Sequence, residues 1–222
     1  ATYVKPGSVL DKEARFRGNS VYFPDRVVPM LPERISNDLC SLREKEDRPA
    51  LACFMVFDKS GTKKSHRFAR AVMRSAAKLS YEEAQAAIDG RSNAKTDVLL
   101  EGVLKPLWKA YGALMKAREK REPLELDLPE RKLVLDDKGK VLRVVTPLRL
   151  DAHKLIEEFM IQANASAAEE LEAKKTPQLY RVHEPPSEEK VRALSMFLKT
   201  LDLSLPLGQV MKPKHFNQLL EE

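Results

Sequence analysis

The chain has 222 residues, of which 39 are Lys or Arg and 33 are Asp or Glu, so its formal net charge is +6 at pH 7. A chain of this length buries roughly 70% of its unfolded surface without help from disulfides, and its two cysteines form no CxxC pattern, which excludes a disulfide framework and a cysteine-rich zinc site. The apolar runs are too short to cross a bilayer and no signal peptide is visible, so the cytoplasm is the expected compartment.

Near its start, the sequence predicts a short helix followed by a rigid loop. The helix covers residues 10–16 and stops at Gly18, because glycine readily adopts the left-handed conformation of a helix end. Residues 19–33 then contain the prolines Pro24, Pro29 and Pro32. Proline fixes φ and lacks a backbone N–H, which excludes a helix interior and a central strand there. Since this loop also carries Tyr22 and Phe23, it is predicted to be a stiff binding element.

The segment 63–79, which follows a predicted strand over residues 49–58, fits two periodicities. As a helix, it would place five basic side chains on one face, namely Lys63, Arg67, Arg70, Arg74 and Lys78. As a strand, it would point Arg70, Arg74 and Lys78 outward, with small and apolar residues facing inward. Both interpretations leave these three residues, the basic stripe, on the surface. The stripe is then either an ordinary solvated face or a surface that binds nucleic-acid phosphates.

Helical patterns dominate the rest of the chain. The predicted elements are a helix from Ser80 to Gly90, a helix over 98–121 with a kink near Pro106, strands over 125–146 around a turn at 136–140, a helix over 150–175, a short strand over 180–183, a helix from Ser187 to 201, and a helix after Pro213. Together with the segments before them, these elements predict an α+β architecture in which a mixed sheet is flanked by helices.

Seven segments follow one another in a diagnostic order. They are residues 7–33, which include Asn-Ser-Val-Tyr-Phe-Pro-Asp-Arg-Val-Val-Pro, and residues 39–42, 47–50, 78–83, 126–130, 157–164 and 179–185. In this order they resemble the catalytic RNB domain of the ribonuclease II and ribonuclease R family. Members of that family are processive 3′-to-5′ exoribonucleases that degrade single-stranded RNA to nucleoside 5′-monophosphates with Mg²⁺. The resemblance implies this activity, RNA partner and cofactor for the protein to which the chain belongs.

The resemblance also implies RNA contacts at named positions. Tyr22 matches a tyrosine that stacks on the 3′-terminal base, and an aromatic face accepts any base. Glu157 and Asn164 match positions that line the same channel, where Glu157 would accept a hydrogen bond from a ribose 2′-OH. A phenylalanine that clamps the bases in some members corresponds here to Leu126, so a two-sided aromatic sandwich is not expected. The structural alternatives are that Tyr22 packs under its own loop and that Glu157 is a solvated helix charge.

By the same resemblance, the catalytic residues are expected outside this chain. The family's metal-binding aspartates lie upstream of residues 3–8, and its arginine segment lies downstream of residues 216–219. The resemblance therefore implies one partial RNB domain over residues 1–222, without catalytic or metal-binding residues, without cold-shock or S1 modules, and inactive when isolated. Its exposed core would favour oligomerisation. The alternative is a non-catalytic RNA-binding or scaffold derivative of the RNB fold.

Overall fold

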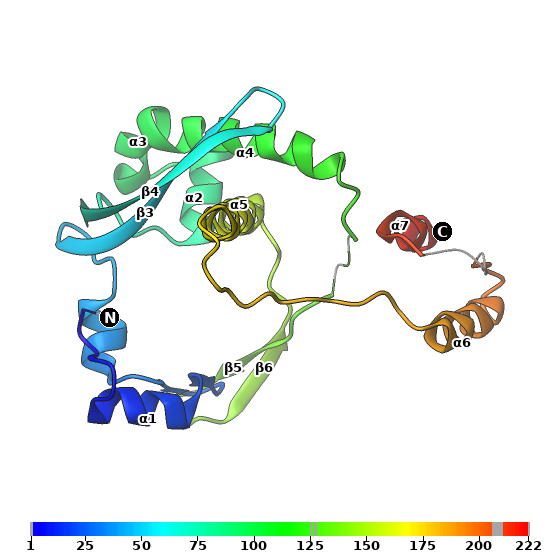
Figure 1. Cartoon of the computed structure of the whole chain (residues 1–222), viewed down its shortest axis with the longest axis horizontal. Coiled ribbons are helices and arrows are strands. Elements are labelled where there is room, and N and C mark those ends of the chain that lie inside the picture. Colours follow the sequence, from blue (N-terminus) through cyan, green and yellow to red (C-terminus); the bar gives the residue numbers. More distant parts are fainter. Residues whose placement is uncertain (1, 125, 127, 206–210, 222) are drawn as a thin grey trace. The chain divides into compact units, whose positions relative to one another are not determined.

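The structure is a computed structural model that describes residues 2–124, 126, 128–205 and 211–221 (Figure 1). Its residues form two compact units. The first unit comprises residues 1–54, 66–106 and 128–156, and the second comprises residues 55–65, 107–127 and 157–222. The hairpin of β3 (Asp47–Phe57) and β4 (Lys63–Arg74) and the long helix α5 (Asp151–Ala173) each contribute residues to both units.

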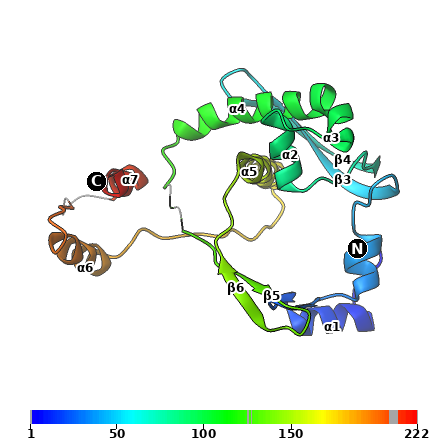
Figure 2. The same cartoon turned by 180° about the vertical axis from the view of Figure 1, so that it is seen from behind.

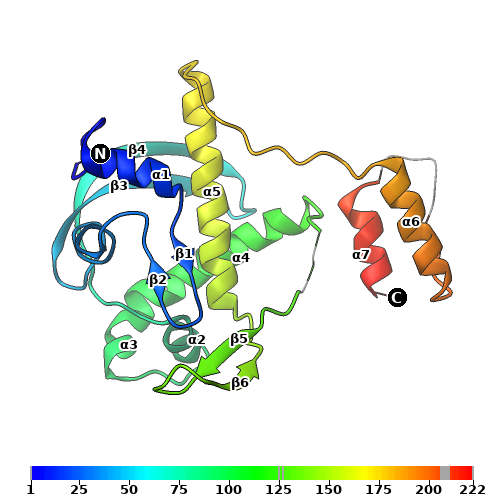
Figure 3. The same cartoon turned by 90° about the horizontal axis from the view of Figure 1, so that it is seen from below.

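The first unit begins with the predicted helix and a small hairpin. Helix α1 (Val9–Arg17) is capped by the Ser8 side chain and ends at Gly18, where φ is 75°, which confirms the predicted glycine stop. A hairpin of β1 (Val21–Tyr22) and β2 (Val27–Val28) follows (Figure 3). The proline-rich segment that the sequence predicts as a loop therefore contains a two-stranded antiparallel hairpin.

The remaining elements of the first unit are mostly those predicted. They are the π-helical turn η1 (Arg34–Leu39), helix α2 (Tyr81–Ile88), helix α3 (Ala94–Leu99), the π-helical turn η2 (Leu100–Leu104), and the strands β5 (Lys132–Leu135) and β6 (Val141–Val145) (Figure 2). The capping box of Ser80 and Glu83 is present at the start of α2. Gln85 on α2 accepts a hydrogen bond of 3.0 Å from the Ala152 N–H, which satisfies one of the free amides at the start of α5.

The helix predicted over residues 98–121 is interrupted. It is divided among α3, η2 and α4 (Lys105–Glu119), and Pro106 lies in the first turn of α4. Proline has no N–H for the preceding turn and its ring crowds the carbonyl four residues earlier, here that of Gly102 in η2. The break therefore occurs at the turn before the proline, as a π-helical segment rather than a simple bend.

Three further predicted helices are confirmed and one predicted strand is wrong. Helix α5 has 23 residues, helix α6 (Glu188–Lys199) begins after the cap Ser187, and helix α7 (Pro213–Glu221) begins with its proline. Residues 180–183 form no strand. None of the helices in the described part of the chain is long and apolar enough to cross a membrane.

The α+β class is confirmed, but the single mixed sheet is not. Within the described residues, the strands form three two-stranded sheets, β1–β2, β3–β4 and β5–β6. Each sheet joins two strands that are neighbours in sequence. Local hairpin formation therefore accounts for the strand pairing of the described part.

Candidate nucleic-acid interface

Tyr22 lies on the outside of the β1–β2 hairpin. Its side chain is 77% exposed, so it does not pack under its own loop. Its backbone pairs with Val27, and the Phe23 N–H donates a 2.8 Å hydrogen bond to the Arg26 carbonyl across the turn. Arg17 at the end of α1 donates a 2.9 Å hydrogen bond to the Pro29 carbonyl beside β2. The ring is thus exposed on a backbone that is held at both ends.

The basic stripe lies along β4 and the segment after it. Residues 63–74 form a strand, which decides between the two periodicities, and Arg70, Arg74 and Lys78 are all exposed. Arg74 Nε lies 2.6 Å from Asp47 Oδ1, so one of these charges is partly neutralised on the surface. The Lys78 N–H donates a 2.9 Å hydrogen bond to Glu44, and this hydrogen bond is the main reason that the pKa of Glu44 is lowered.

Helix α5 carries a buried row of polar side chains, which we call the polar ladder. Its members Glu158, Gln162 and Ser166 are spaced four residues apart and are 1%, 8% and 0% exposed. Gln162 Nε2 donates a 3.0 Å hydrogen bond to Glu158, and Ser166 Oγ donates one of 2.8 Å to the Gln162 carbonyl. Because buried polar groups need partners, such a row demands complementary groups from neighbouring elements.

Two arginines of the α4 region neutralise the buried carboxylate of the ladder. Arg121 Nη2 lies 2.7 Å from Glu158 Oε1, and Arg118 Nη1 lies 3.3 Å from Glu158 Oε2. Burial by itself would raise the pKa of Glu158, but the hydrogen bonds from Gln162, Arg121 and Arg118 outweigh it and hold this pKa below its usual value. The carboxylate is therefore ionised at neutral pH.

A lysine at the tip of the β3–β4 hairpin satisfies the other end of the ladder. Lys63 Nζ donates a 2.8 Å hydrogen bond to Ser166 Oγ and lies 2.7 Å from Glu169 Oε2. Together with Arg118 and Arg121, this lysine joins the hairpin tip, the α4 region and α5 within the second unit. The ladder is a means of positioning α5.

Glu157 and Asn164 lie on α5 beside the ladder. Their separation of seven residues places them on one face of the helix, two turns apart, as the sequence predicts. The Glu157 side chain is 40% exposed and its Oε1 lies 3.7 Å from Arg118 Nη1, while Asn164 is exposed. These two residues belong to the second unit, whereas Tyr22 and the basic stripe belong to the first.

Glu158, Gln162, Ser166 and Arg118 were not among the residues expected from the sequence, and Lys63 was expected only as a basic residue of the segment 63–79. A spacing of four residues puts the three ladder residues on one helical face, and this regular polar spacing was the available signal. It could not identify the partners, because Arg118 and Lys63 come from segments that are 40 and 103 residues distant from their contacts in the chain.

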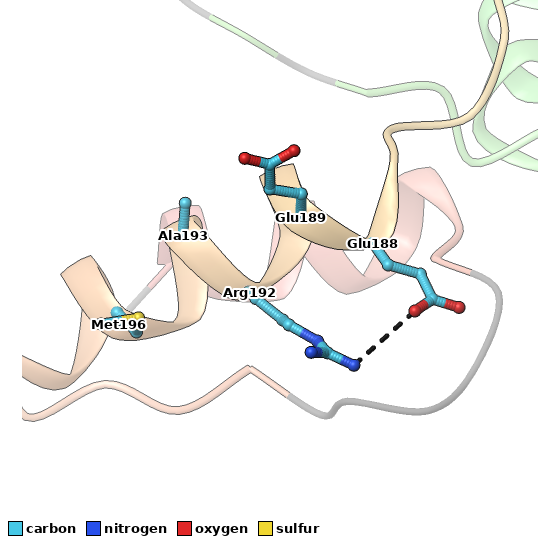
Figure 4. Close-up of a pocket in the computed structure, with 5 residues that line it drawn as sticks. All are labelled: Glu188, Glu189, Arg192, Ala193 and Met196. Atoms are coloured by element: carbon cyan, nitrogen blue, oxygen red, sulfur yellow. Dashed lines mark ion pairs between the residues drawn. The ribbon is translucent and has the colours of Figure 1, made fainter.

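Adjacent acidic residues occur in the sequence, among them Glu188 with Glu189 and Asp136 with Asp137, but their side chains do not converge on a common point. Figure 4 shows Glu188 and Glu189 on α6 pointing in different directions, with Glu188 Oε2 3.7 Å from Arg192 Nη2. Asp136 accepts hydrogen bonds from the Lys138 and Lys140 N–H groups of its own turn. In the described ranges, no three His, Cys, Asp or Glu side chains form a group that could hold a metal ion. These residues do not fit a Mg²⁺ site, and we assign no metal ligand among them.

Comparison with known proteins identifies the class to which this fold and surface belong. The sequence profile of the RNB domain matches residues 1–222, and the chain belongs to the RNB domain family. Ribonuclease R of Escherichia coli (strain K12) is 40% identical over 220 residues, a match that covers 99% of this chain and 27% of the relative. Ribonuclease R of Aquifex aeolicus (strain VF5) is 41% identical over 222 residues, covering 99% of this chain and 31% of the relative.

A solved structure matches the entire chain. Mycoplasma genitalium RNase R in complex with ribose methylated single-stranded RNA is similar with a TM-score of 0.91 and 28% identity, covering 100% of this chain and 35% of that one. The chain thus spans between 27% and 35% of the length of these three proteins. The similarity extends over both compact units.

Proposed function

We propose that the protein containing this chain is a processive exoribonuclease that degrades single-stranded RNA from its 3′ end to nucleoside 5′-monophosphates, with Mg²⁺ as cofactor. The similarity of the whole chain to an RNase R bound to single-stranded RNA is the observation that carries this proposal. Because the described residues hold no group suited to a metal, the role proposed for residues 1–222 is to bind and position RNA.

Within this role, each interface residue has a distinct task. Tyr22 stacks on the 3′-terminal base, a task for which its 77% exposure suits it. Glu157 accepts a hydrogen bond from the ribose 2′-OH of that nucleotide, which distinguishes RNA from DNA, and Asn164 lines the channel along the same helix face. The basic stripe attracts backbone phosphates without regard to sequence.

Two labelled forms of one single-stranded RNA test the proposed activity of the whole protein. With a 3′ label, we expect immediate release of a labelled mononucleotide, and with a 5′ label, conversion to short end products with few intermediates. EDTA should stop both reactions, and a DNA strand of the same sequence should remain intact. RNA that is bound but never shortened would instead support the non-catalytic RNA-binding or scaffold alternative, and early release of a 5′ label would overturn the direction.

A further inference from the structure

Arg118 lies between two neighbouring carboxylates of α5. Its Nη1 is 3.3 Å from the buried Glu158 and 3.7 Å from Glu157, and its side chain is only 18% exposed. Glu157 itself is 40% exposed and therefore open to a ligand. One guanidinium thus joins the buried polar ladder to the carboxylate at the candidate interface.

Arg118 is held in place by the ladder. Glu158 is 1% exposed and also binds Arg121 and Gln162, so its carboxylate has little freedom to move. A planar guanidinium that is anchored on such a group keeps a defined orientation, unlike the flexible ammonium of a lysine. The long side chain of Glu157 would otherwise sample several rotamers. Its ion pair with Arg118 limits them.

We propose that Arg118 is a positioning residue that orients the Glu157 carboxylate toward the ribose of the 3′-terminal nucleotide. This inference rests on the proposed function, in which Glu157 accepts a hydrogen bond from the 2′-OH. Loss of Arg118 leaves that acceptor present but poorly aimed. Removal of the Arg118 guanidinium is therefore expected to weaken the discrimination between ribose and deoxyribose, an effect that a general loss of stability would not produce.

The test compares Arg118→Met with Arg121→Met in the whole protein. Both variants remove a guanidinium from Glu158, but in the described structure only that of Arg118 pairs with Glu157 as well. The substrates are two RNA strands that differ only in the 3′-terminal sugar, which is ribose in one and 2′-deoxyribose in the other. The measurement is the kcat/KM for the ribose strand divided by the kcat/KM for the deoxyribose strand. We expect Arg118→Met to lower this ratio about tenfold, as for a misaligned hydrogen bond to a charged group, and Arg121→Met to leave it unchanged.

A double variant separates failure of this inference from failure of the proposed function. Glu157→Gln alone should lower the ratio, and adding Arg118→Met should lower it no further, because Arg118 acts through Glu157. If Glu157→Gln leaves the ratio unchanged, the role proposed for Glu157 is wrong. If Glu157→Gln lowers it and Arg118→Met does not, or if Arg121→Met lowers it equally, the positioning role of Arg118 is wrong.

Discussion

Tyr22 offers a residue-scale test of base stacking. We expect Tyr22→Ala in the whole protein to change the length of the shortest RNA product, because the loss of a stacking contact worth about 1–3 kcal/mol lets the 3′ end sit differently. Product ladders from a labelled single strand measure this length. Phe23→Ala is the control, since Phe23 is the adjacent exposed aromatic on the same hairpin, at 52% exposure. If the wild type, Tyr22→Ala and Phe23→Ala all give the same shortest product, Tyr22 does not set the position of the RNA.

Gly61 at the tip of the β3–β4 hairpin combines a backbone requirement with a close approach to α4. Its φ is 79°, and a Cβ at this position would lie 2.1 Å from the Ala113 carbonyl oxygen. We expect Gly61→Ala to destabilise the fold by more than the roughly 1–2 kcal/mol of left-handed strain alone. Gly139→Ala is the matched control, because Gly139 has a φ of 76° and nothing within 4 Å of its Cβ position. If both variants shift the urea midpoint of unfolding equally, the close contact between residue 61 and α4 does not affect stability.

The buried Glu158 carboxylate predicts a loss of stability in acid. Its pKa is lowered in the folded state, so the stabilisation is fully present above the unfolded pKa of about 4.3 and is lost as pH falls through the folded pKa. At pH 7, Glu158→Gln should reduce the free energy of unfolding by about 3 kcal/mol, because it leaves charged partners of a buried group unpaired. The difference between wild type and variant should shrink below about pH 4. If the difference in the free energy of unfolding stays constant from pH 7 to below about pH 4, the pKa of Glu158 is not lowered in the folded state.

At the scale of elements, local sequence signals were reliable where a side chain caps or stops a helix. The predicted caps Ser80 and Ser187 are present and Gly18 ends a helix, because these effects depend on a few adjacent residues. The segment 63–79 could not be assigned in this way, since its spacing suits a helix and a strand equally. Pairing with β3 decides for a strand.

The basic stripe predicts an element-scale effect on salt dependence. If its three residues contact RNA phosphates, their replacement by Gln in the whole protein should reduce the slope of log K against log salt by about 2. Because Arg74 is already paired with Asp47, it contributes less to phosphate binding, and the reduction of the slope can be smaller than for three unpaired charges. The control replaces three exposed basic residues of the β5–β6 hairpin, Lys138, Lys140 and Arg143. Equal reductions in both variants would indicate general charge attraction, and no reduction would make the stripe an ordinary solvated face.

At the scale of the whole molecule, a polypeptide of residues 1–222 is expected not to hydrolyse RNA with Mg²⁺ or Mn²⁺. Two-metal phosphodiester hydrolysis needs several converging carboxylates. Here Glu158 is neutralised by arginines, Glu169 by Lys63 and Glu188 by Arg192, while Asp136 caps its own turn. The assay uses a 5′-labelled single strand with an EDTA control. This expectation would be contradicted if the fractions that contain the polypeptide after gel filtration released mononucleotides in a metal-dependent reaction.

The sequence by itself determined the family, the helix caps Ser80 and Ser187, the helix stop at Gly18 and the shared helix face of Glu157 and Asn164. These features depend on residue order or on periodicity within one element, both of which are visible in a single chain. Tertiary structure alone decided that residues 63–74 are a strand and that the predicted sheet is three hairpins in the described part of the chain. It also decided that Arg118 and Lys63 meet α5. Such contacts join segments that are distant in sequence, and no local pattern specifies which charged side chains will meet in the folded chain.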